Sequence, residues 1–431
     1  MFQTLKNAWN IADLRKRLIY TLTILLLFRI GTAIPVPFLD PGVLKNFITG
    51  DNNWLGYIDL LSGGAFSQST IFALSISPYI TSSIVIQLLT VAIPAWENLA
   101  KEGEEGRKIL NKYTRYATVA LAALQSTAYY FLMKKYNAVN YTEGLTGIFA
   151  AAVIIITFMA GSMLVTWMGE QIDNKGVGNG ISMILFAGIV SRGTSVLNML
   201  YTELIFVING VAKYYLILPL TIVLFFAAII FIVVMTNGER RIPIQYAQRV
   251  VGRKMYGGQS SHIPIKVNMS GVLPVIFASS IMAIPGTIAG FAGVDMNSML
   301  GKILGVLNYT HWFYAILYFF LIMAFNYFYI AIQYNPLEIA NNLRKNNGTI
   351  PGIRPGKPTA DFIARVVGKV TVVGGIFLAV IAIGPILLSN LVGVNMSLGG
   401  TSIIIVVGVA LDTVRQLESQ MMMRHYKGFL E

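Results

Sequence analysis

Ten long apolar runs, nearly free of ionisable residues, determine what this chain can fold into. The interior of a bilayer is roughly 30 Å thick and needs about 20 apolar residues per helix. The runs lie at 18–34, 71–93, 116–133, 148–168, 180–200, 214–235, 271–290, 312–333, 370–391 and 401–420. Runs this continuous lack the alternation of barrel strands, so we predict an all-α membrane protein with ten transmembrane helices, spans 1 to 10.

The distribution of basic residues predicts the orientation. Of the 32 Lys and Arg residues, 25 lie in the N-terminal tail, in the loops after spans 2, 4, 6 and 8, or in the C-terminal tail, and 7 lie on the other side. The positive-inside rule then places both termini in the cytoplasm. The first run is too long for a signal peptide and is followed by Ile34-Pro35-Val36-Pro37 rather than a cleavage site, so we expect it to be a retained span.

The ten spans divide into two halves of five, residues 1–210 and 211–431. An odd number of spans per half forces the halves to be inverted relative to each other, and inverted repeats place a functional path at their interface near the bilayer midplane. No similarity between the two halves is visible in the residues, so the inversion rests on topology alone.

A segment between spans 1 and 2 is unusual. Residues 54–66, WLGYIDLLSGGAF, are too few and too interrupted by glycine to span the membrane, yet too apolar for an ordinary loop. A re-entrant half-helix folded into the protein would satisfy both facts. An amphipathic external loop is the alternative.

Two cytoplasmic loops, about 236–270 and 334–369, are long and basic. The first contains Ile242–Tyr246, which can form extended structure, so we predict a hairpin. In the second, prolines and glycines on both sides of Arg354 predict a rigid, exposed tip. Basic loops commonly set topology and contact anionic lipid. The length of these two favours a docking site for a large cytoplasmic partner.

The spans lack the residues that most chemistry needs. Coupled transporters keep ionisable residues inside the membrane, and here we count in the interior of the spans Arg29 in span 1 and Asp412 toward the cytoplasmic end of span 10. Cysteine is absent and the three histidines lie in loops or the tail, so we expect no metal site. The glycine-rich stretch Gly176–Gly180 lacks the Lys-Ser/Thr ending of a phosphate loop. We therefore expect neither an enzyme nor a cofactor, and an inverted-repeat solute transporter is the formal alternative.

Several motifs resemble the bacterial SecY family. Residues 169–182, GEQIDNKGVGNGIS, resemble the family's signature between spans 4 and 5, and 71–80 with 87–89 resemble its span 2. Further similar stretches lie at 101–108, 113–116, 266–274 and 351–356. The resemblance covers the whole chain in the right order. It implies a protein-conducting channel that passes unfolded polypeptides across the membrane and releases hydrophobic segments sideways into lipid.

The resemblance also implies partners and a location. The expected partners are the SecE and SecG subunits, the SecA motor ATPase, the ribosome, preproteins with signal sequences, and anionic membrane lipid. The expected location is the bacterial cell (plasma) membrane, with both termini cytoplasmic. Nothing in the chain is expected to bind nucleotide, so the energy would come from the partner.

Six aliphatic residues match the family's pore constriction. This predicted pore ring consists of Ile76, Ile80, Ile181, Leu185, Ile276 and Ile405. A ring of branched aliphatic side chains offers ions no hydration, yet it can yield around a sliding chain. Ile76 and Ile80 are four residues apart, like Ile181 and Leu185, and so would share a helix face. Isoleucine is also a common residue in any membrane helix. The resemblance, and not the spacing, therefore selects these six residues. Leu185 departs mildly from the usual isoleucine.

The resemblance assigns a plug at about 55–70 and a lateral gate between spans 2 and 3 and spans 7 and 8. The plug residues are Tyr57, Leu60, Leu61, Gly63, Gly64 and Phe66, with the two glycines as a hinge. Thr81, Gln125 and Asn268 are candidates for polar contacts that hold the gate shut, and satisfied helix-packing groups are the alternative. Ile284 stands where many relatives carry an aromatic residue, so we expect it to alter how the gate opens.

The docking surface is assigned in the same way. Arg354 aligns with the arginine on which motor-driven translocation depends in the family, and a guanidinium on a rigid tip suits a bidentate acidic contact. The wider basic footing for the motor or the ribosome consists of Arg240, Arg241, Arg249, Arg344 and Lys345.

Overall fold

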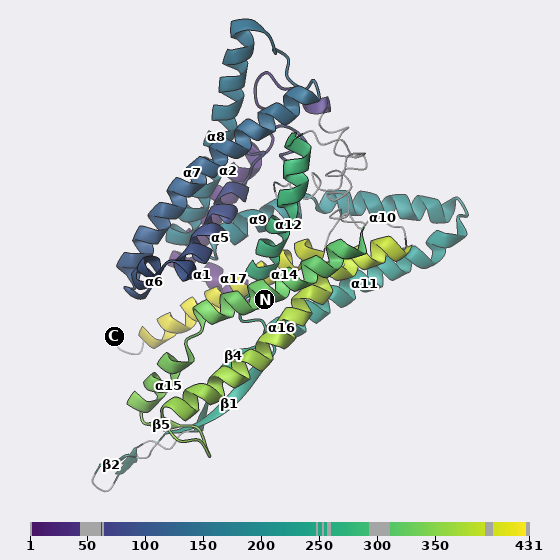
Figure 1. Cartoon of the computed structure of the whole chain (residues 1–431). Coiled ribbons are helices and arrows are strands. Elements are labelled where there is room, and N and C mark those ends of the chain that lie inside the picture. Colours follow the sequence, from purple (N-terminus) through teal and green to yellow (C-terminus); the bar gives the residue numbers. More distant parts are fainter. Residues whose placement is uncertain are drawn as a thin grey trace. The chain divides into compact units, whose positions relative to one another are not determined.

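The computed structural model in Figure 1 describes residues 2–43, 62, 64–246, 249–251, 254–256, 260–292, 311–392 and 400–427. These residues are mostly helical. The helices are α1 (Phe2–Asn10), α2 (Ala12–Gly31), α5 (Ser77–Ala92), α6 (Pro94–Lys101), α7 (Glu104–Lys135), α8 (Gly144–Lys175), α9 (Gly180–Ser191), α10 (Gly193–Ile208), α11 (Ala212–Asn237), α12 (Leu273–Ala292), α14 (Trp312–Gln333), α15 (Pro336–Lys345), α16 (Lys357–Val392) and α17 (Gly400–Lys427). The strands are β1 (Glu239–Tyr246), β2 (Arg249–Val251), β3 (Lys254–Tyr256), β4 (Ser260–Lys266) and β5 (Gly348–Thr349).

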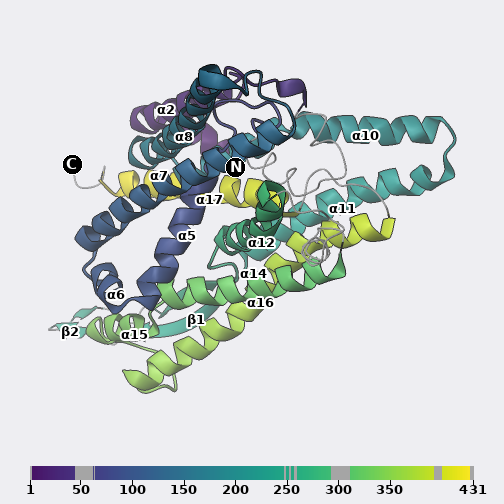
Figure 2. The ribbon, with the colours of Figure 1, turned by 45° about the horizontal axis from the view of Figure 1, so that its top comes forward.

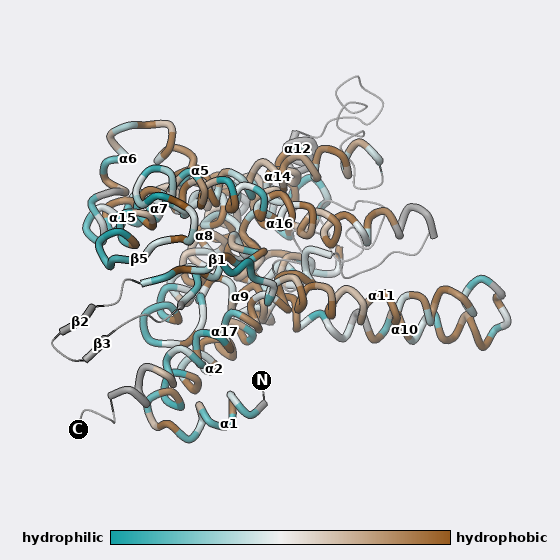
Figure 3. Tube along the Cα trace, turned by 90° about the horizontal axis from the view of Figure 1, so that it is seen from below, coloured by the Kyte–Doolittle hydropathy of each residue, from teal (hydrophilic) through white to brown (hydrophobic). Residues whose placement is uncertain are grey.

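A helix lies on each of the ten apolar runs, and Figure 3 shows the hydrophobic character along helices such as α11 and α16. In the described part of the chain, five helices are long and apolar enough to cross a membrane, and up to six if the bent pair Ser77–Ala92 and Pro94–Ala100 counts as one span. The chain is therefore a multi-pass helical membrane protein. The count of ten spans stays a prediction.

Two runs are less regular than the sequence predicts. In the run at 71–93, helix α5 begins only at Ser77, where Pro78 occupies the first turn, and residues 71–76 form successive turns. In the run at 180–200, α9 ends at Ser191 and α10 begins at Gly193, with Arg192 between them. A glycine at the start of α10 contributes to this break because it is a poor helix former.

The chain divides into two compact units. The first contains Met1–Leu218, Ser280–Tyr314 and Ile405–Glu431, and the second contains Pro219–Ser279 and Ala315–Ile404. This division reflects which segments contact one another. It does not test the predicted halves 1–210 and 211–431, which are defined by membrane topology. The inverted halves therefore stay a prediction.

Small side chains let the helices of the first unit pack closely. Helix α7 packs against α5 and α8, and α2 packs against α8 and α9 (Figure 2). On α7, every fourth residue from Thr114 to Ser126 is small and buried, namely Thr114, Thr118, Ala122 and Ser126. In lipid, helices associate through such small residues because apolar side chains gain nothing by leaving the bilayer.

Helix α8 approaches a non-helical segment in the same way. A Cβ atom on Gly161 would lie 1.8 Å from the carbonyl oxygen of Ile71, so only glycine fits. One residue further on, the hydroxyl of Ser162 donates to the carbonyl of Ser75 at 3.1 Å. These contacts hold the turns that precede α5 against α8.

The second unit contains a small sheet with its own apolar core. Strand β1 lies between β4 and β5, pairs antiparallel with both, and sets Ile242 opposite Ile263. This confirms the predicted hairpin. Inward-facing residues of β1 and β4 pack on helices α14, α15 and α16 in a core that contains Ile242, Ile244, Ile265, Ile330, Leu343, Ile350, Ile363 and Val367.

The region 334–369 is mostly helical, whereas the sequence was interpreted as a long loop. Helix α15 covers ten residues of it, and α16 begins at Lys357, thirteen residues before the apolar run at Val370. The signals for α15 are visible in the sequence. Asn335 caps the helix by accepting from the Glu338 amide, Pro336 occupies the first turn, and Arg344 and Lys345 occupy the last.

The close approach at Gly161 generates a stability prediction. We expect Gly161→Ala to destabilise the protein by about 1–3 kcal/mol, because the added methyl group must displace the Ile71 carbonyl. Gly368→Ala on α16 is the matched control, since nothing lies within 4 Å of its added Cβ. Thermal unfolding in detergent would measure both variants. Equal melting temperatures would contradict the prediction.

Candidate functional site

Five of the six predicted ring residues belong to the first unit. Ile76, Ile80 and Leu185 are buried there, Ile181 is half-buried, and Ile405 on α17 is 1% exposed. Ile276, at 5% exposure, belongs to the second unit. The ring as a whole therefore stays a prediction.

The two pairs with a spacing of four differ. Ile181 and Leu185 both lie on α9, as expected. Ile76 is the N-cap residue of α5, so it lies at the start of the helix that carries Ile80 and not within it. The Ile80 amide still donates to the Ile76 carbonyl at 3.1 Å, which keeps the two residues one turn apart.

Three side chains from three helices hold the turn before α9. Thr21 on α2 accepts from the Val177 amide at 3.0 Å, Gln416 on α17 accepts from Gly178 at 2.7 Å, and Asp173 on α8 accepts from Gly180 at 2.7 Å. The glycines of the 169–182 motif are explained by sterics. Gly178 has φ +87°, and a Cβ on Gly180 would lie 1.9 Å from the Gly169 carbonyl oxygen. This turn positions the helix that carries Ile181 and Leu185.

The structure describes only part of the predicted plug. Tyr57, Leu60, Leu61 and Gly63 lie outside the described residues. Gly64 has φ +88°, a conformation that favours glycine and agrees with a hinge. Phe66 is 2% exposed and packs among residues of α7 and α8.

The segment from Ala65 to Ile76, which begins within the predicted plug, is mostly buried although it is not helical. Its turns are closed by bonds such as that from the Thr70 amide to the Ala65 carbonyl at 3.1 Å. Ser69 and Ser75 have φ angles of +50° and +48°, and both hydroxyl groups are buried without a hydrogen-bond partner among the residues that the structure describes. Such strain persists where the surrounding structure enforces it, and it clusters at functional segments.

The candidate gate residues form no hydrogen bonds with one another in the described part of the chain. The Thr81 hydroxyl donates to the Ser77 carbonyl of its own helix at 3.1 Å, which agrees with the packing alternative. Gln125 is half-buried on α7, and Ile284 on α12 is 44% exposed. The Asn268 side-chain oxygen is buried with no hydrogen-bond partner in the described structure. No described hydrogen bond joins Thr81, Gln125 and Asn268, so their role in a gate stays a prediction.

A buried amide on α14 joins three segments of the second unit. Asn326 accepts from the Ser270 hydroxyl at 2.5 Å and donates to the Thr371 carbonyl at 2.8 Å. All three residues are at most 4% exposed. Ser270 lies just before α12, which carries Ile276, so Asn326 fixes the start of this helix to α14 and α16.

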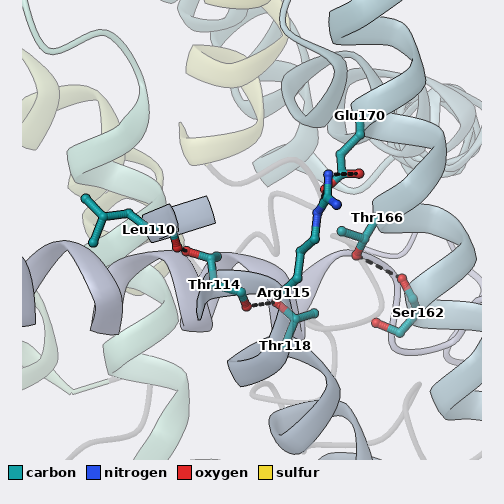
Figure 4. A network of polar contacts seen from close by, with 7 residues as sticks. All are labelled: Leu110, Thr114, Arg115, Thr118, Ser162, Thr166 and Glu170. Atoms are coloured by element: carbon teal, nitrogen blue, oxygen red, sulfur yellow. Dashed lines mark hydrogen bonds and ion pairs between the residues drawn. The ribbon is translucent and has the colours of Figure 1, made fainter. Parts of the chain in front are cut away.

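An ion pair joins α7 and α8. The guanidinium of Arg115 donates to both carboxylate oxygens of Glu170 at 2.8 Å (Figure 4). Nearby hydroxyl groups of Thr114, Thr118 and Thr166 donate to carbonyls of their own helices. The polar groups of this interface are thus satisfied within the protein.

The predicted docking residues of the second unit lie on its strands, on α15 and in the loop before α16. Arg240 and Arg241 are exposed on β1, Arg249 lies on β2, and Arg344 and Lys345 are exposed at the end of α15. Arg241 forms an ion pair with Glu239 at 2.6 Å. We call the strands β1 to β5, helix α15 and the loop 350–356 the basic module.

Arg354 occupies the exposed tip of this module. The preceding turn is closed by the Ile353 amide donating to Ile350, and the Arg354 carbonyl accepts from the Thr359 hydroxyl at 2.8 Å. Gly352 and Gly356 have φ angles of +79° and +99°. The backbone of Arg354 is therefore fixed while its side chain is exposed, as the sequence predicted.

Sequence reasoning missed Asn326, Tyr129 and the Arg115–Glu170 pair as structural groups. A lone amide in an apolar span was a usable signal for Asn326, because such groups bond to neighbouring helices. Among the described residues, no group of three or more His, Cys, Asp and Glu side chains could hold a metal ion.

Comparisons with known proteins agree with this fold. The SecY family model matches residues 70–414. The protein translocase subunit SecY of Corynebacterium glutamicum is 42% identical, with 99% of each chain covered. Its counterpart from Thermotoga maritima is 39% identical, covering 100% of this chain and 98% of that one.

Solved structures are similar at lower identity. A structure described as a protein-conducting channel has a TM-score of 0.64 at 18% identity, covering 94% of this chain and 92% of that one. Sec61 in the canine ribosome–channel complex gives 0.62 at 18% identity, covering 94% and 92%. The fold is that of the protein-conducting channels.

The chain belongs to the SecY family. This family supplies the channel subunit of a protein translocase and not an enzyme, so the prediction of a protein-conducting channel is confirmed. The alternative of a solute transporter is not favoured.

The Asn326 contacts generate a second prediction. We expect Asn326→Leu to lower the free energy of unfolding by about 1–2 kcal/mol, because it removes two buried hydrogen bonds at similar volume. Thermal unfolding in detergent would measure it. Combining it with Ser270→Ala should cost less than the two single changes together, because the groups share a bond. An additive double variant would speak against the network.

Proposed function

We propose that this chain forms the pore of a bacterial translocase that passes unfolded preproteins across the cell membrane and releases hydrophobic segments sideways into lipid. The observation that carries the proposal is the similarity of the whole chain to translocase subunits, at about 40% identity. The chain spans the membrane with ten helices in two inverted halves, and both termini are cytoplasmic. The excess of Lys and Arg on one side supports this orientation.

The six aliphatic ring residues form the constriction of the pore. Burial of Ile76, Ile80 and Leu185 in the first unit supports this role, because these side chains lie inside the protein and not against lipid. Branched aliphatic side chains exclude hydrated ions at rest and part around an extended chain. The plug at about 55–70 closes the external side of the ring and moves aside by the Gly63–Gly64 hinge.

The lateral gate lies between spans 2 and 3 and spans 7 and 8. A signal sequence opens it by binding the open state better than the closed state. Thr81, Gln125 and Asn268 provide polar groups at this gate. The exposed side chain of Ile284 gives it a small aliphatic surface.

The basic module docks the cytoplasmic partner. SecA or a translating ribosome contacts Arg354, and Arg240, Arg241, Arg249, Arg344 and Lys345 provide the wider positive footing. The exposed guanidinium on a fixed backbone supports this assignment, because less freedom is lost on binding. Similar channels bound to ribosomes support the ribosome as a partner. SecE and SecG complete the membrane complex, and anionic lipid contacts its basic face.

Motor-driven uptake into proteoliposomes tests the proposal. The chain is reconstituted with SecE and SecG, supplied with SecA, ATP and a preprotein, and scored by protease-protected product. We expect uptake by the wild type and a more than tenfold loss in Arg354→Glu, because the charge reversal repels the acidic contact.

Arg365→Glu, the same charge change at an exposed position on regular helix α16, is the matched control and should stay within about twofold of the wild type. Equal uptake by all three proteins would sink the role of Arg354 and keep the channel. No uptake by the wild type, beside a working translocase, would sink the proposed function.

A further inference from the structure

The side chain of Tyr129 on α7 contacts Phe66, a buried residue of the predicted plug. The Tyr129 hydroxyl donates to the Phe66 carbonyl at 2.9 Å. The two rings also pack together, with centroids 4.5 Å apart, and the Tyr129 ring meets Phe158 of α8 at 4.9 Å. Tyr129 and Phe66 are 1% and 2% exposed. The contact is therefore a buried hydrogen bond reinforced by tilted and edge-to-face contacts between aromatic rings.

The backbone on both sides of Phe66 is arranged around this contact. The Phe66 amide donates to the Ser62 hydroxyl at 3.0 Å, and the Ser69 amide donates to the Phe66 carbonyl at 3.1 Å. Downstream, the segment is buried as far as α5 and meets α8 at Gly161 and Ser162. Upstream lies Gly64, with its positive φ. Ala65 and Ser62, upstream of Phe66, are buried as well, so the Tyr129 contact lies within a packed stretch that includes the last described residues of the plug.

We propose that Tyr129 is a positioning residue that anchors the base of the plug and thereby stabilises the closed state of the pore. This inference rests on the proposed function, because it assigns a latch to the plug that function requires. The Tyr129–Phe66 contact holds the described part of the plug against α7, so the plug leaves its closed position only when this contact loosens. Weakening the contact frees the base of the plug and makes opening at rest more frequent.

The chain offers a matched pair of variants. Tyr129→Phe removes the hydroxyl and keeps the ring, and the Phe66 carbonyl retains the Ser69 amide as a donor. Tyr130→Phe removes a hydroxyl from the adjacent tyrosine, which is 7% exposed in the same apolar cluster and for which no hydrogen bond to Phe66 is described. The two proteins differ only in which hydroxyl is missing.

Two readouts follow the base of the plug directly. The chain has no cysteine, so Gln68→Cys, at an exposed position two residues after Phe66, gives a unique site for a spin label. Label mobility is measured in the reconstituted channel, and resting ion conductance is measured in planar bilayers without preprotein. A merely structural role for Tyr129 would lower the melting temperature and leave the mobility and conductance of the folded channel unchanged.

We expect Tyr129→Phe to raise label mobility and to raise resting conductance about fivefold, the factor that one buried hydrogen bond supplies. Tyr130→Phe should change neither. Phe66→Leu, which removes the ring contact and keeps the hydroxyl bond, should raise both readouts less. Wild-type values for Tyr129→Phe in both readouts would overturn the anchor. Absence of preprotein uptake by the wild type would count against the proposed function, while label mobility would still decide the anchor.

Discussion

The burial of a non-helical backbone segment among membrane helices is the constraint on which the rest of the first unit depends. Most of residues 65–76 are buried away from water, so their amides and carbonyls must find partners inside the protein. They do so through tight turns, through pairing with residues 34–36, and through Tyr129 and Ser162. The glycine of α8 that admits Ile71, and the strained conformations of Ser69 and Ser75, follow from the same requirement.

Much of the architecture could be predicted from local patterns. The apolar runs predicted helices, Pro and Gly around Arg354 predicted the exposed tip, and the capacity of Ile242–Tyr246 for extended structure predicted the hairpin. Helix α15 was not predicted although its Asn335 cap and the basic last turn with Arg344 and Lys345 are readable in the sequence, because its asparagines and charged residues are equally typical of a loop. The predicted start of α5 was wrong because apolar composition alone does not distinguish a buried turn from a helix.

Other features could not be predicted, because they join residues far apart in the chain. Tyr129 and Phe66 are separated by 63 positions, and Asn326 and Ser270 by 56. A single sequence shows a tyrosine or an amide in an apolar run but not its partner. The ring and gate residues were selected by resemblance alone, since isoleucine in a membrane helix carries no further local signal.

Helix α16 is 36 residues long, and at 1.5 Å per residue it measures about 54 Å. This exceeds the roughly 30 Å of a hydrocarbon core, so a large part of the rod must stand outside the bilayer. The Arg354 loop is bonded to its first turn, and Asn326 is bonded to its middle through Thr371. The helix is thus continuous from the Arg354 loop into its apolar part, so a displacement of the loop would be carried along a single element to the buried bond between Thr371 and Asn326.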